Sequence, residues 1–306
     1  MRILTIACSS LLLLPCMSAN VWANPVVQIP SEAELSGKKI AQSSKNNPTY
    51  VADNSWDSSN DKKLEDVKLK LQDIQQRNFT PSRGVPALTI ANPYGFGADR
   101  GFYTGLSYQT DTRGGLEGKN DGDATWGFGV GLGNAQKSVG AELSYNLASF
   151  GQNGRDFGSG GFNLKVHRKI ANGWGVAAGW NSFLSVGDAN DLDDSLYLAT
   201  TKIFKTRAKA DSPFSRVGAT IGVGNGQFRS EDDIANDNGR VNVFASLACR
   251  VARPVSLVAE WTGQDLGMGV SISPFRTIPV TVNLSARDLV GAGDGTRFVV
   301  GIGSGL

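Results

Sequence analysis

The feature that most constrains the fold is a two-residue alternation between Val241 and Val251. Every second side chain there is apolar, and polar or charged residues such as Asn242 and Arg250 lie between them. Because residues i and i+2 share one face of a strand, this segment has one apolar face and one mixed face. Segments with the same alternation recur from about Phe102 onward. The pattern predicts a series of strands with one apolar surface.

The first 23 residues have the character of a secretion signal. Arg2 precedes the mostly apolar run 3–14, and small residues lead to Ala23, after which we expect cleavage. The run is shorter than the ~20 residues that a spanning helix needs, which disfavours an uncleaved anchor. Lipidation at Cys16 is also disfavoured, because Pro15 rather than a small residue precedes it.

Charge and cysteine content exclude several functions. Without Arg2, the chain has 29 basic and 28 acidic side chains, which gives no reason to expect a nucleic-acid partner. Cys249 is then the only cysteine, and its apolar alternation partners indicate a small apolar side chain rather than a catalytic thiol.

The acidic stretches 188–194 and 231–233 lack the ligand spacing of a calcium loop. The sequence predicts no cofactor and no metal site.

Residues 24–100 differ in composition from the rest of the chain. Ser, Asn, Lys and Asp dominate before Leu64, so we expect a largely disordered, flexible periplasmic segment. A short helix is predicted near 61–77 from an apolar stripe formed by Leu64, Val67, Leu71 and Ile74. Such a helix is too short to be stable alone, so we expect it to dock on the mouth of the β-barrel that the strand pattern described next predicts, or to mediate self-association. An extended linker follows, marked by Pro81, Pro86 and Pro93.

Residues 101–306 are predicted to form about twelve strands. Their expected ranges are 101–110, 123–133, 136–147, 158–169, 172–183, 194–206, 213–224, 239–252, 254–262, 265–273, 277–287 and 295–304. Short connections at 134–135, 171–173, 207–212, 252–254 and 274–276 alternate with longer polar loops at 111–122, 151–156, 187–193 and 229–238. Tight turns on the periplasmic side and long loops outside are typical of a membrane barrel. An even strand number places both barrel ends on the periplasmic side.

The two faces of these strands have different predicted surroundings. Trp126, Phe128 and Leu132 would face lipid, while the glycines between them face the lumen. Aromatic side chains near strand ends predict an interfacial belt of Trp126, Tyr145, Trp174, Trp180, Tyr197 and Trp261. A soluble sandwich would instead have polar outward faces. Outer-membrane lipid is therefore an expected partner.

In these features the chain resembles the small outer-membrane β-barrel proteins of bacteria. The resemblance covers roughly two-thirds of the sequence and rests on pattern rather than on a motif. It implies an all-β fold, a closed antiparallel up-and-down transmembrane β-barrel in the bacterial outer membrane. Members of this class usually end on a strand with a terminal aromatic residue, whereas Leu306 stands here.

Alternation places a set of charged side chains on the inner wall of the predicted barrel. They are Glu142, Lys165, Lys202, Arg216, Arg250, Glu260, Arg287 and Arg297, with Lys202 included if Tyr197, Ala199 and Ile203 face lipid. One hypothesis is a narrow porin-like channel in which the basic excess, Arg216, Arg250, Arg287 and Arg297, favours small polar or anionic solutes. The alternative is a structural envelope barrel whose lumen is filled by charged side chains. Phe244 and Ala248 interrupt the polar inner face and predict a partly packed interior.

An outer-membrane hydrolase is the third and least favoured class. Such enzymes depend on a histidine, and His167 is the only one in the chain. Alternation turns His167 inward at the end with the tight turns, and no Gly-x-Ser-x-Gly motif accompanies it. The sequence therefore predicts a protein that is not an enzyme, with no catalytic residue.

Overall fold

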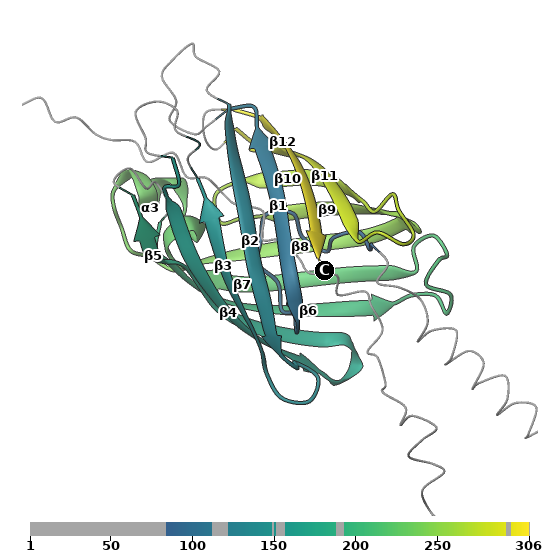
Figure 1. Ribbon diagram of the computed structural model, residues 1–306. Helices are drawn as coiled ribbons and strands as arrows, with labels where there is room; N and C mark the ends of the chain where they lie inside the picture. The colour runs from purple at the N-terminus through teal and green to yellow at the C-terminus, as the bar shows by residue number, and fades with distance from the viewer. Residues whose placement is uncertain are drawn as a thin grey trace, which may run out of the picture. The chain divides into compact units, whose positions relative to one another are not determined.

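The computed structural model describes residues 84–111, 122–148, 150, 157–187, 193–291 and 295–305. In these residues twelve antiparallel strands form a closed barrel, in which β1 pairs with β2 and β12 (Figure 1). Every other strand pairs with its neighbours in sequence. The strands are β1 Gly101–Gln109, β2 Asp123–Gly133, β3 Gly140–Leu147, β4 Gly160–Ile170, β5 Trp174–Val186, β6 Ser195–Lys205, β7 Arg216–Gly224, β8 Asn242–Ala252, β9 Val255–Trp261, β10 Leu266–Ile272, β11 Val280–Arg287 and β12 Arg297–Gly305. The predicted up-and-down barrel is confirmed.

Strand boundaries differ from the prediction mainly beside the tight turns. The predicted strand 136–147 begins only at Gly140, because residues 134–139 form a turn in which the Ser138 amide donates to the Asn134 carbonyl at 2.9 Å. Short helices interrupt two connections: η1 Ala171–Gly173 between β4 and β5, and η2 Gly226–Phe228 with α3 Glu231–Ala235 between β7 and β8. We call the end with the connections β2–β3, β4–β5 and β10–β11 the turn rim, and the opposite end the loop rim.

The strand β8 has the two faces that its alternation predicts. Phe244, Ala248 and Arg250 are buried in the barrel, whereas Val243 and Leu247 are 49% and 55% exposed on the outside. Other strands expose large apolar side chains in the same way, among them Phe102, Trp126, Leu132, Trp174, Leu198, Ile221, Met268 and Phe298. An apolar outer surface around a closed barrel fits the hydrocarbon of a membrane. This is the architecture of a small outer-membrane β-barrel.

No helix among the described residues is long and apolar enough to cross a membrane.

Several predictions lie outside the described residues. They are the signal 1–23, the segment 24–83 with its helix near 61–77, and self-association through that helix. All three stay predictions.

The prediction of a flexible periplasmic linker up to residue 100 is wrong for residues 84–99. This stretch, which we call the lumen segment, has no regular secondary structure, and residues 86–98 are all buried. Its main-chain atoms contact inward-facing side chains of β3, β4, β6, β9 and β10. The segment therefore fills the barrel interior, because its apolar side chains and main-chain groups find partners there.

Candidate functional site

The lumen segment enters and leaves the barrel at the turn rim. At its start, the Ala87 amide donates to Ser271 Oγ at 2.7 Å, near the end of β10. At its end, Asp99 accepts from the Ala135 amide at 2.8 Å in the β2–β3 turn, and β1 begins two residues later. Between these points the segment extends toward the loop rim as far as Ile90 and Ala91 and then turns back toward the turn rim. It is thus a loop folded into the lumen from one side.

Glu260 holds the top of this loop. Its two carboxylate oxygens accept from the amides of Ile90 and Ala91 at 2.7 and 2.8 Å, and Ser246 Oγ donates to Oε1 at 3.1 Å. Glu260 is the sixth of the seven residues of β9 counted from the turn rim. The adjacent Asn92 donates its side-chain amide to Ser246 Oγ at 2.9 Å and to the Trp261 carbonyl at 2.9 Å. Hydrogen bonds to a carboxylate are stronger than neutral ones, so Glu260 is a principal anchor.

Glu142 and Lys165 hold the returning half of the loop. The Ala98 amide donates to Glu142 Oε1, and Lys165 Nζ donates to the Phe96 carbonyl at 2.5 Å. Lys165 Nζ also lies 3.5 Å from Glu142 Oε2 and 4.6 Å from the Tyr94 ring centroid. Both charges are predicted lumen residues, and the structure shows that they bind the chain's own backbone.

An apolar cluster packs the lumen around the segment. Its members are Leu88, Ile90, Tyr94, Phe96, Ala248 and Val258, with Ile203 packed against them. Inward glycines of the barrel make room for it: a Cβ on Gly218 would lie 2.5 Å from Leu88 Cδ2, and one on Gly269 would lie 2.4 Å from Ile90 Cδ1. The partly packed interior that Phe244 and Ala248 predict is confirmed.

The arginines predicted to line the passage fall into two pairs at opposite rims. Near the turn rim, Arg250 donates to the Ala210 carbonyl at 3.3 Å, and Arg216 donates to the Arg207 carbonyl at 2.9 Å. Near the loop rim, Arg287 and Arg297 are paired across β11 and β12 and are both buried. Arg297 Nη2 lies 2.5 Å from Asp265 Oδ2. The four arginines do not form one continuous basic path.

Lys202 lies on the outer face, so its assignment to the lumen is wrong. In β6, Tyr197, Ala199 and Thr201 are buried inside, whereas Leu196 and Leu198 are exposed. Lys202 Nζ donates to the Asn172 carbonyl at 2.5 Å and lies 5.0 Å from the Trp174 ring centroid. The predicted aromatic belt therefore loses Tyr197, which packs in the lumen against Phe228 and Phe244 at centroid distances of 6.0 and 6.5 Å. That aromatic cluster fixes which face of β6 turns inward.

His167 is enclosed beneath the lumen segment at the turn rim. It is 1% exposed, and its Nε2 lies 3.2 Å from Asp99 Oδ1. Lys169 Nζ lies 2.7 Å from the other Asp99 oxygen. Partial burial alone would raise the pKa of Asp99, but hydrogen bonds from Lys169, Ala135 and His167 and the charge of Lys169 hold it below its ordinary value of 3.8. Asp99 therefore anchors the lower end of the segment as a carboxylate.

The contribution of Asp99 to stability should decrease at acidic pH. Because its pKa is lowered in the folded state, its contribution is complete above pH 3.8 and is lost as pH falls through the lower folded value. We expect Asp99→Asn to lower the free energy of unfolding by about 1 kcal/mol at neutral pH, since the carboxylate is partly exposed. Urea unfolding in lipid vesicles measures this difference, which should shrink toward zero once the pH falls below the lowered folded-state pKa of Asp99.

Asp211→Asn is the matched control. Asp211 is exposed and forms a surface pair with Arg253 at 3.3 Å, so its replacement should change stability little at either pH. An Asp99→Asn effect that stays constant down to the lowest pH would contradict the anchoring role.

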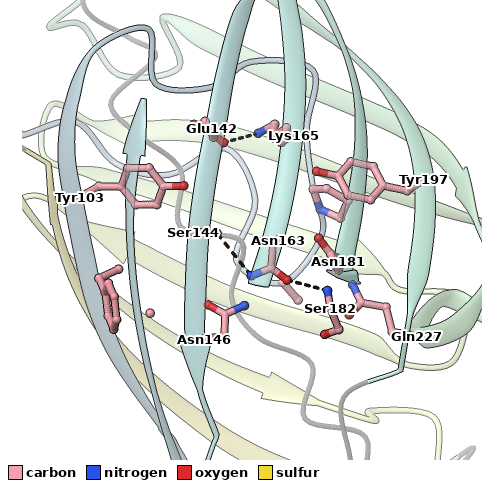
Figure 2. A pocket seen from close by; sticks show the side chains of 14 residues that line it. Tyr103, Glu142, Ser144, Asn146, Asn163, Lys165, Asn181, Ser182, Tyr197 and Gln227 are labelled. Carbon is pink, nitrogen blue, oxygen red and sulfur yellow. Dashed lines mark hydrogen bonds and ion pairs between the residues drawn. The ribbon is translucent and has the colours of Figure 1, made fainter. Parts of the chain in front are cut away.

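Above the lumen segment lies a small polar cavity (Figure 2). Its volume is about 60 Å³, and Ala91 and Pro93 of the lumen segment contribute to its lining. Polar side chains from β1, β3, β4, β5, β6 and η2 line the rest: Tyr103, Glu142, Ser144, Asn146, Asn163, Lys165, Asn181, Ser182, Tyr197 and Gln227. Of these residues, Glu142 and Lys165 belong to the predicted pore-lining set, and strand alternation also turns Ser144 and Asn146 inward.

No metal-ligand cluster of three or more His, Cys, Asp or Glu side chains occurs among the residues that the structure describes.

Comparisons with known proteins find similarity at the level of the barrel. No family model matches the chain, and no curated protein matches it. Among solved structures, the KdgM porin has 10% sequence identity and a TM-score of 0.41, over 67% of this chain and 99% of that chain. Omp33 of Acinetobacter baumannii has 9% identity and a TM-score of 0.39, over 68% and 99%. An outer membrane channel from Pseudomonas putida F1 has 12% identity and a TM-score of 0.39, over 70% and 99%. One fold hosts many functions, so function has to be argued from the lumen itself.

Proposed function

We propose that this chain is a channel of the bacterial outer membrane for small polar solutes, closed at rest by the lumen segment. The observation that carries the proposal is that Glu142, Lys165 and Glu260, charged groups on the inner wall, bind the backbone of a loop that enters and leaves at one rim. Such a loop can withdraw without threading through the barrel. The tight turns of this barrel class face the periplasm, so withdrawal is toward that side.

The strength of the attachment is compatible with movement. A hydrogen bond to a charged group contributes about 1.5–3 kcal/mol. Ordering the backbone of one residue costs about 1–2 kcal/mol, and the lumen segment has sixteen residues without regular structure. The ordering cost opposes these hydrogen bonds, so we infer that the loss of several contacts shifts the population toward an open state.

A structural envelope barrel is the second candidate. The apolar cluster around Leu88, Tyr94 and Phe96 favours it, because it packs the lumen like the core of a soluble protein. In that case the lumen segment never leaves, and its contacts serve stability alone.

A disulfide tether distinguishes these two functions. A Cβ on Gly269 would lie 2.4 Å from Ile90 Cδ1, so these two side chains face each other, and Gly269→Cys with Ile90→Cys can fix the top of the segment inside the lumen. Both ends of the segment already lie at the turn rim. In a Cys249→Ser background, we expect channel openings in planar bilayers to disappear on oxidation and to return on reduction, while each single-cysteine variant opens throughout.

Two results would contradict the channel. Openings that persist in a chain whose cross-link is verified by mass spectrometry would show that the segment does not close it. Silence of the untethered chain at all voltages would favour the structural barrel.

A further inference from the structure

We propose that the polar cavity above the lumen segment is a binding site for an uncharged, polyhydroxylated solute of the carbohydrate class. This solute would be the one that the proposed channel transports, so its transport rests on the proposed function. Its binding can be measured whether or not the barrel conducts. Concave sites with a few convergent polar groups are the usual form of small-molecule sites.

The cavity is electrically neutral. Glu142 and Lys165 are the charged side chains in its lining, and they lie 3.5 Å apart, with each bound to the lumen segment. The two arginine pairs lie at the rims and are not among the lining residues. A carboxylate or phosphate entering the cavity would lose hydration without gaining an unpaired positive charge, which disfavours anions.

Three amide side chains of the lining have no hydrogen-bond partner among the described residues. Within the described part of the chain, the side chains of Asn146, Asn181 and Gln227 make no hydrogen bond, and Figure 2 shows them around the cavity with Ser182. Each amide has one acceptor and one donor group side by side. A hydroxyl group is also both donor and acceptor, so a polyol matches several such amides at once.

An irregularity in β5 turns two consecutive polar side chains into the cavity. The β4–β5 register shifts between Phe162 and Leu164, and Ser182 opposite has a φ of 53°. Asn163 stabilises this bulge: its Oδ1 accepts from the Ser182 amide at 2.9 Å, while its Nδ2 donates to Ser144 Oγ at 3.3 Å. As a result Asn181 and Ser182 both line the cavity, although neighbours in a regular strand point to opposite faces. Bulges that redirect side chains are frequent beside binding sites.

Two tyrosine rings frame the cavity. Tyr103 lies against Gly129 and Tyr197 against Gly179, where a Cβ would approach the rings to 2.6 and 2.3 Å. The glycines let these rings lie close to the barrel wall. A tyrosine offers an apolar ring and a polar hydroxyl, and the C–H surface of a sugar ring with its hydroxyls has the same mixed character. The volume of about 60 Å³ holds several water molecules, so the hydroxyl-bearing edge of a sugar, rather than a whole ring, can enter the cavity and take their place.

The test is saturation-transfer difference NMR on the full chain refolded in a phosphocholine detergent, which carries no sugar. The probes are D-glucose, D-galactose and D-xylose, with D-glucuronate as the charged counterpart of glucose. We expect at least one neutral sugar to bind with a dissociation constant of about 1–10 mM, and glucuronate to bind more weakly than glucose. The double variant Asn146→Ala, Asn181→Ala should weaken binding at least about fivefold, because it removes two bidentate partners.

Asn283→Ala is the matched control, since Asn283 is an inward-facing amide of β11 outside the cavity. Heat-modifiable gel mobility verifies that each variant is folded. The proposal is overturned by the absence of binding for all three neutral sugars, by binding of glucuronate alone, or by equal loss in the control and the double variant. Sugar binding by a chain that is silent in bilayers would remove the channel and leave the site intact.

Discussion

A chain without residues 24–99 should conduct continuously in a planar bilayer, with a time-averaged conductance about tenfold or more above that of the mature full chain. The lumen segment supplies Leu88, Tyr94 and Phe96, which pack the interior, so its removal lets water fill the lumen. Glu142, Lys165 and Glu260 then lose their backbone partners and become solvated charges on the inner wall. A water-filled lumen with solvated charges on its wall lets ions pass, whereas a lumen packed by the segment does not.

The control retains the lumen segment and removes only residues 24–83. It should conduct like the full chain, because it keeps residues 84–99, which make the described contacts with the inner wall. Heat-modifiable mobility must show that both truncated chains form the barrel. If both stay as silent as the full chain, other groups close the lumen and the segment is not the gate.

The second large effect is expected from one added methyl group, in Gly175→Ala. A Cβ at Gly175 would lie 2.5 Å from the Gly95 carbonyl oxygen and from the ring of Phe96. The contact with Gly95 is backbone against backbone, so a rotamer change cannot relieve it. Overpacking of this kind costs about 1–3 kcal/mol, and displacement of the segment relieves it. We therefore expect longer and more frequent channel openings in bilayer recordings.

Gly301→Ala is a suitable comparison, because Gly301 is also an inward-facing strand glycine. Its added Cβ would have its nearest contact, the Leu106 carbonyl oxygen, at 3.6 Å, an ordinary van der Waals separation. Conductance and stability should stay close to those of the parent chain. Equal behaviour of the two alanine variants would show that the approach of Gly95 to Gly175 does not control opening.

The barrel could be predicted because its signal is local. Alternation with a period of two sets both the strands and their faces, and it placed Arg250 and Phe244 correctly inside. The error at Lys202 came from a strand with apolar residues on both faces. There the decisive contacts are those of Tyr197 with Phe228 and Phe244, which lie far along the chain.

The lumen segment could not be predicted in the same way. Its contacts join residues far apart, such as Ile90 and Glu260, which are separated by 170 positions. Its prolines, Pro86 and Pro93, indicated a linker. Two signals in the sequence nevertheless agree with the structure: large apolar residues return after a polar stretch, and inward glycines leave space that no strand side chain fills. Only the two signals together indicate that this segment fills the lumen.

The lumen segment continues directly into β1, and β1 forms the seam of the barrel with β12 through seven paired positions from Tyr103 to Gln109. The last strand, β12, thus pairs with the strand to which the lumen segment is joined. A chain that closes this seam before the segment is inside has an empty lumen, which the segment can still enter through the turn rim, where both its ends lie. A separate peptide of residues 84–99, added to a barrel that is already closed, would have to enter without this tether to β1.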